Sequence, residues 1–76
     1  MNTCLKRSTK SYNLGNGYGI ECVTIENQYT GERYFDVNVI LLTVPWLEVV
    51  NKVTRIYDPT VANKVFKEFK ERYGSL

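Results

Sequence analysis

Four carboxylates are the side chains in this sequence whose types and spacing come closest to a catalytic arrangement. Paired carboxylates perform general acid and base catalysis in glycoside hydrolysis, and the candidates are Glu21, Glu26, Asp36 and Glu48. In the strand pairing expected below, Glu26 lies close to Asp36 on one face of a sheet. A catalytic pair needs a cleft that removes water from one of its members, and a chain of 76 residues has little room for one. We therefore interpret these carboxylates as part of a solvated sheet face and predict no catalytic residues.

Other catalytic and ligand-binding chemistries lack the residues they need. The chain contains no histidine, so the commonest general base and transition-metal ligand is missing. Its two cysteines are isolated and no Asp-x-Asp loop occurs, which leaves no metal-ligating pattern. The glycines of residues 15–19 precede an expected strand, whereas a phosphate-binding loop follows a strand and opens a helix. The sequence predicts a protein that is not an enzyme and that uses no metal and no cofactor.

Length and composition indicate one small domain spanning residues 1–76. Apolar residues make up 43% of the chain and charged residues 24%, as in ordinary folded domains. Ten Lys and Arg against eight Asp and Glu give a net charge of +2, too balanced to make nucleic-acid binding the first expectation. The sequence shows no signal-peptide pattern and no apolar run long enough to cross a membrane. We expect a cytoplasmic protein without a membrane contact, in which Cys4 and Cys22 stay reduced.

Turn signals divide the first half of the chain into three strands. Residues 16–17 (Asn-Gly) are typical of a type I′ turn, in which both central residues take positive φ. Residues 29–31 (Tyr-Thr-Gly) predict a three-residue hairpin loop with Gly31 in the left-handed conformation. The expected strands lie within residues 4–14, 18–28 and 32–42. In the first hairpin Cys22 lies opposite Ser11, too far from the other cysteine for a disulfide.

The hydrophobic pattern of the second and third strands predicts how they pair. Pairing Gln28 with Glu32 places Val23 opposite Val37 and puts six apolar side chains on one face. This expected core face consists of Val23, Ile25, Phe35, Val37, Val39 and Leu41. The opposite face carries Tyr18, Ile20, Cys22 and Thr24 against Tyr34, Asn38, Ile40 and Leu42. Because this second face is half apolar, we expect another part of the chain, a second copy or a partner to cover it.

Residues 43–57 carry two competing signals. Their polar residues recur at helical spacing, and Pro45 is tolerated in the first turn of a helix. Their many β-branched residues favour a strand instead, but residues 44–46 lack the Gly, Asn or Asp expected in a connection between strands. We favour the helix. The expected fold class is α+β, a three-stranded antiparallel meander followed by helices (βββαα), or ββββα if residues 46–57 form a strand.

The C-terminal segment predicts a helix. Asp58 is a favourable N-cap, Pro59 fits the first helical position and Gly74 marks the end. The apolar stripe expected to pack on the sheet consists of Ala62, Val65, Phe66, Phe69 and Tyr73.

The half-apolar second face predicts a binding protein. Exposed apolar patches mark interaction sites on small domains, and Tyr and Arg are frequent in interface hot spots. We therefore expect protein–protein recognition, or a homodimer, through that face and the adjoining hairpin edge. The candidate binding residues are Tyr18, Ile20, Tyr29, Arg33, Tyr34, Ile40 and Leu42.

The size of the chain suggests how such binding is used. Small single-domain proteins without histidine or catalytic signatures are frequent among phage and mobile-element accessory proteins. Such proteins commonly act by occluding a host machine, as anti-CRISPR inhibitors do. Size and type, rather than a sequence motif, associate this chain with them, and we expect an inhibitor that binds a host protein.

Nucleic-acid binding is the alternative function. A three-stranded sheet backed by a helix can enter the major groove, while tyrosines stack on bases and Lys and Arg contact phosphates. The basic residues available for this role are Lys6, Arg7, Lys10 and Arg33.

Overall fold

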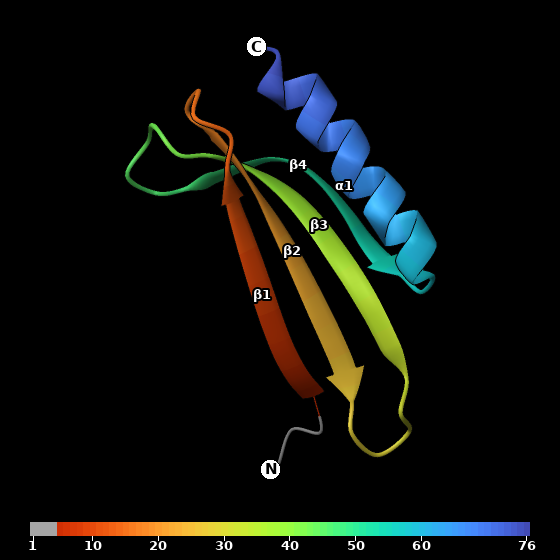
Figure 1. The fold of residues 1–76 in the computed structure, drawn as a ribbon. Helices are drawn as coiled ribbons and strands as arrows, with labels where there is room; N and C mark the ends of the chain where they lie inside the picture. Colours follow the sequence, from red (N-terminus) through yellow and green to blue (C-terminus); the bar gives the residue numbers. More distant parts are fainter. Residues whose placement is uncertain (1–4) are drawn as a thin grey trace.

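Within residues 5–76, four strands in chain order form one antiparallel sheet, and a single helix follows them (Figure 1). The computed structural model describes residues 5–76. The elements are β1 (Leu5–Asn13), β2 (Tyr18–Asn27), β3 (Arg33–Leu41), β4 (Glu48–Ile56) and α1 (Pro59–Gly74). The α+β class is confirmed, in its ββββα form.

The strand β4 corrects the preferred prediction of a helix over residues 43–57. Its β-branched residues pair antiparallel with β3, for example Val53 with Val37. Pairing with β3 therefore stabilises a strand here, although the polar residues recur at helical spacing. The missing turn glycine is replaced by Leu47, which itself takes the left-handed conformation at φ 50°. The alternative of a fourth strand is therefore confirmed, and the second helix is wrong.

The pairing of β2 with β3 differs from the predicted register by one residue. The Asn27 N–H donates to the Glu32 carbonyl at 2.8 Å, so the loop contains the four residues 28–31 rather than three. The Asn27 side chain lengthens the turn because its Oδ1 accepts from the N–H groups of Tyr29 (3.0 Å) and Thr30 (3.2 Å). Gly31 takes φ 75°, which confirms its left-handed conformation.

The changed register exchanges which residues of β2 face the helix. Ile20 now pairs with Val39 and Cys22 with Val37, and this is the face on which α1 packs. The buried cluster on this face consists of Ile20, Val37, Val39, Ile56 and Phe69. Val23 and Ile25 are buried as predicted, but they lie on the opposite face, so the prediction that they share one face with Phe35, Val37 and Val39 is wrong.

The first hairpin also turns differently from the type I′ prediction. The Leu14 N–H donates to the Tyr18 carbonyl at 2.9 Å, and positive φ falls on Gly15 (80°) and Gly17 (91°) rather than on the Asn between them. A three-residue loop places Cys22 opposite Lys10, not opposite Ser11 as predicted. Cys4 lies outside the described residues, so the absence of a disulfide stays a prediction.

The C-terminal helix begins and ends where the sequence predicts. The Asp58 side chain accepts from the Thr60 N–H at 2.8 Å, Pro59 opens the helix, and the helix ends at Gly74. Phe69 is buried against the sheet, and the Phe66 ring lies 4.8 Å from that of Tyr12. The aromatic stripe therefore joins α1 to the sheet.

The Phe69 ring is the largest side chain that α1 contributes to the buried core. We expect Phe69→Ala to lower the free energy of unfolding by about 3–5 kcal/mol, because the change leaves a cavity in a small core. Urea denaturation followed by circular dichroism measures the change. The matched control is Val61→Ala, which truncates an exposed residue of the same helix and should stay within about 0.5 kcal/mol of wild type. Equal midpoints for Phe69→Ala and wild type would contradict the core assignment.

Candidate functional site

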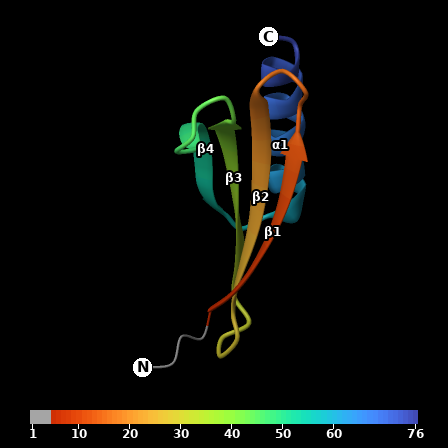
Figure 2. The same ribbon diagram turned by 90° about the vertical axis from the view of Figure 1, so that its left-hand side faces the viewer.

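One face of the sheet is left without a covering element. Figure 2 shows α1 on one side of the sheet, and within residues 5–76 no helix or strand packs on the other side, which we call the open face. Ile25 is only 3% exposed there, and it pairs with Tyr34, whose ring lies 5.9 Å from that of Tyr57. This end of the open face is therefore closed by neighbouring side chains.

At the other end, the β3–β4 connection borders a hollow that we call the open-face groove. Its volume is about 270 Å³. It lies between the β3 end and its connection, which contribute Ile40, Leu42 and Leu47, and the facing parts of β1 and β2, which contribute Ser11, Tyr12, Asn13, Ile20 and Glu21. Gly19 forms the floor, since a Cβ there would lie 3.2 Å from the Leu42 Cδ1 atom. The groove is thus lined mainly by apolar atoms.

Large apolar side chains are exposed along the same connection and the start of β4. Trp46 is 69% exposed and Leu47 is 56% exposed, and Val49 and Leu42 are also exposed. Leu47 holds its side chain there from a left-handed backbone, a conformation that disfavours a branched apolar residue. A strained, solvent-facing leucine next to an exposed tryptophan is typical of a recognition surface rather than of a loop shaped only for folding.

The seven predicted binding residues do not form one surface. Ile40 and Leu42 line the open-face groove, and Tyr34 lies at the far end of the same face. Tyr18 and Ile20 face α1, and Ile20 is only 1% exposed, so the prediction that they share a binding face with Ile40 is wrong. The register error explains this, because a shift by one residue moves every side chain of a strand to the other face.

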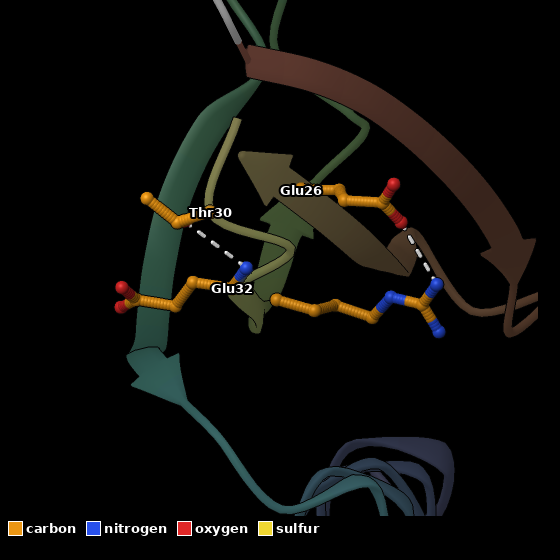
Figure 3. Close-up of polar contacts among 4 residues, drawn as sticks. Glu26, Thr30 and Glu32 are labelled. Atoms are coloured by element: carbon orange, nitrogen blue, oxygen red, sulfur yellow. Dashed lines mark hydrogen bonds and ion pairs between the residues drawn. The ribbon is translucent and has the colours of Figure 1, made fainter. Parts of the chain in front are cut away.

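Tyr29 and Arg33 lie at the β2–β3 hairpin. Tyr29 is 81% exposed at its tip. The Arg33 guanidinium forms an ion pair with Glu26 at 2.8 Å, and the Glu32 N–H donates to the Thr30 hydroxyl at 3.2 Å (Figure 3). The hairpin therefore holds Arg33 by its own carboxylate, far along the strands from the groove.

The surface residues that the sequence interpretation missed are Trp46, Leu47 and Val49. Residues 43–57 were expected to be helical, with Trp46 and Val49 among the apolar positions of that helix. Trp46 is the sequence feature that indicated this surface. It directly follows Pro45 in a segment that connects two strands, where a large aromatic side chain does not belong to the apolar pattern of either strand.

The carboxylates do not form a catalytic pair. Glu26 pairs in register with Arg33 on the helix side, whereas Asp36 pairs with Val23 and lies on the open face, so the expected proximity of Glu26 and Asp36 is wrong. Asp36 Oδ1 accepts from the Arg55 N–H at 3.0 Å and holds an irregularity in β4. Residues 5–76 contain no group of three or more His, Cys, Asp or Glu that could hold a metal ion.

A second hollow, of about 290 Å³, lies between β1, β2 and the start of α1. It contains the free thiol of Cys22, which is half-buried and pairs in register with Lys10. Burial raises the pKa of the Cys22 thiol, and the Lys10 ammonium opposes part of that rise. Because the thiolate is the nucleophile, this environment makes Cys22 less reactive at neutral pH.

Comparison of the chain with protein-family models, with curated proteins and with solved structures finds no match. Within the described residues, no helix has the length and apolar character that crossing a membrane requires. Function is therefore inferred from the surfaces of the molecule themselves.

The raised pKa of Cys22 predicts slow alkylation. In a Cys4→Ser variant, where Cys22 is the remaining thiol, iodoacetamide at about pH 8 should react more slowly with the folded protein than with the urea-unfolded chain. Lys10→Gln should slow the reaction further, since it removes the positive charge that lowers the pKa. Mass spectrometry of timed samples measures both rates. Faster alkylation after Lys10→Gln would contradict this description of the thiol.

Proposed function

We propose that this protein is a non-catalytic binding protein that recognises another protein through the open-face groove and its apolar rim. We define the rim as Leu42 and Leu47, which line the groove, together with the exposed Trp46 and Val49, which are close to them in the chain. The observation that carries the proposal is the exposure of these four side chains along the β3–β4 connection and the start of β4, where Leu42 and Leu47 line the groove.

The physical argument is that the rim side chains, while exposed to water, do not contribute the free energy that their burial would supply. Burial of one large apolar side chain contributes about 1.5–3 kcal/mol, and a 76-residue domain has a small core and a small margin of stability. Four such residues within eight positions of the chain concentrate exposed apolar surface in one region, and concentrated apolar surface is what marks an interaction site. The exposed Trp46 suits the buried centre of a protein interface, where aromatic residues are enriched, and the aliphatic side chains near it would exclude water.

The mode of action we propose is occlusion. A protein of 76 residues that acts by contact alone can cover the working surface of a larger assembly, as accessory inhibitors of phages and mobile elements do. In this proposal the partner is a host protein in the cytoplasm, and the chain itself performs no reaction. A second copy of the chain is the competing occupant, because an isologous contact needs only one self-complementary surface.

Charge placed on the rim should abolish recognition. We expect Leu42→Glu with Leu47→Glu to remove photo-crosslinking between the rim and its protein partner in a host extract, because desolvating a carboxylate opposes burial. Val61→Glu, on the exposed side of α1, is the matched control and should crosslink as wild type does. Light scattering on the same variants tests the second copy. Unchanged crosslinking and an unchanged oligomeric state in the rim variant would contradict the proposal.

The strained residue of the rim offers a separate test. Asn adopts the left-handed conformation more readily than Leu, so Leu47→Asn should leave the free energy of unfolding unchanged or raise it by up to about 1 kcal/mol. The same change should weaken partner recognition, since it removes an apolar contact from the groove wall. A lower free energy of unfolding together with an unchanged crosslinking yield would indicate that Leu47 serves folding instead. Urea denaturation and the crosslinking yield give the two quantities.

A further inference from the structure

The two edges of the sheet differ in a way that the open-face groove does not explain. Strand β4 has register shifts at two places along β3, and its Arg55 takes φ 54°, so this edge is bulged and bent. Strand β1 instead pairs with β2 at nine consecutive positions without a shift, and all nine of its residues are exposed. A regular, exposed edge is a template on which another strand can pair, whereas a bulged edge resists pairing.

The backbone groups that β1 presents can be assigned from the ladder. The Leu14 N–H bonds to Tyr18, so even-numbered residues of β1 bond inward to β2, because antiparallel pairs alternate between bonded and non-bonded. Arg7, Thr9 and Ser11 therefore direct their N–H and C=O groups outward. These alternating donors and acceptors match those of another extended polypeptide. A nucleic-acid backbone offers no alternating donors that could bond to the outward C=O groups.

The side chains of β1 give this edge a positive charge. Lys6 and Lys10 lie on the helix side and Arg7 on the open face, following the alternation of the strand. In residues 5–76 the one ion pair joins Arg33 to Glu26, so the three cations of β1 have no carboxylate within 4.0 Å. Helix α1 packs mainly on β2, β3 and β4 and touches β1 through the Phe66 ring on Tyr12, which leaves the outward backbone edge of β1 free.

We propose that β1 binds an extended acidic segment of a partner protein as a fifth strand of the sheet. Backbone bonds form at Arg7, Thr9 and Ser11, and carboxylates at alternate positions of the segment meet Lys6 and Lys10 on one face. A carboxylate on the other face meets Arg7. The same charges oppose pairing of β1 with a second copy of itself, as lysines on edge strands do. This edge is separate from the apolar rim, and the inference goes beyond the function proposed above.

A proline substitution tests the strand addition directly. Because the Thr9 N–H points outward, Thr9→Pro removes a donor of the edge and no bond between β1 and β2. The probe is a fluorescent peptide of about nine residues, the length of β1, with glutamate at alternate positions and valine or threonine between them. In fluorescence anisotropy near physiological salt, we expect Thr9→Pro to bind about tenfold more weakly than wild type. Thr9→Ala keeps the N–H and should bind as wild type does.

Further variants separate strand addition from attraction between charges. Lys6→Gln with Lys10→Gln should also lower the affinity for the peptide, while Leu42→Glu with Leu47→Glu should leave that affinity unchanged. If Thr9→Pro fails to fold by circular dichroism, the wild-type protein is titrated with the same peptide N-methylated at alternate residues, which keeps its charge and removes its donors. We expect the methylated peptide to bind about tenfold more weakly.

Three outcomes would overturn the proposal. One is equal affinity for the plain and the methylated peptide, which would show attraction between charges without strand pairing. Another is the absence of peptide binding near physiological salt. The third is tight, salt-sensitive binding of labelled duplex DNA that is lost in Lys6→Gln with Lys10→Gln and kept in Thr9→Pro, which would assign the cations to nucleic acid.

Discussion

The turn capped by Asn27 is the constraint on which the rest of the molecule depends. Its side chain accepts from two backbone N–H groups and fixes a four-residue loop, and that loop sets the pairing of β2 with β3. One residue more or less in the loop would exchange the two faces of the sheet. With the observed loop, Ile20 and Cys22 lie under α1, and Val23 and Ile25 turn to the open face. The core and the open-face groove are two consequences of the same turn.

The sequence predicted the elements that local chemistry decides. Asp58, Pro59 and Gly31 act through their own backbone conformation or their own hydrogen bonds, and each lies where it was expected. Register was not predictable in the same way, because apolar residues occupy both faces of β2 and either pairing forms an apolar face. Strand β4 depended on a tertiary contact, the free edge of β3, which outweighed a helical spacing. The groove was missed because its rim belongs to the β3–β4 connection. The position of that connection depends on β4, which was expected to be a helix.

A single helix explains why so much apolar surface is left over. The 16 residues of α1 span about 24 Å at about 1.5 Å per residue, enough to lie across one face of the sheet and no more. A sheet buried on both faces needs a second layer, and the Cα trace is only 15 Å deep. Yet β2 carries apolar residues on both of its faces, and so does β3. Tyr34 and Tyr57 close one end of the open face from within the chain, and the other end keeps the hollow bordered by Leu42 and Leu47.

In the described part of the chain, residues 5–76, the two non-glycine residues with left-handed backbone both belong to the β4 region, Leu47 just before the strand and Arg55 within it. Each conformation costs free energy locally, and each has an identifiable result. At Arg55 the N–H reaches the Asp36 carboxylate, and the resulting bulge makes β4 a poor template for another chain. At Leu47 the result is an apolar side chain facing solvent beside the groove. One strained residue thus protects an edge from pairing, and the other presents a contact. The opposite edge, β1, has no residue with positive φ. Its positive charges oppose pairing with a second copy of β1, and in the proposal above they favour a strand of negative charge.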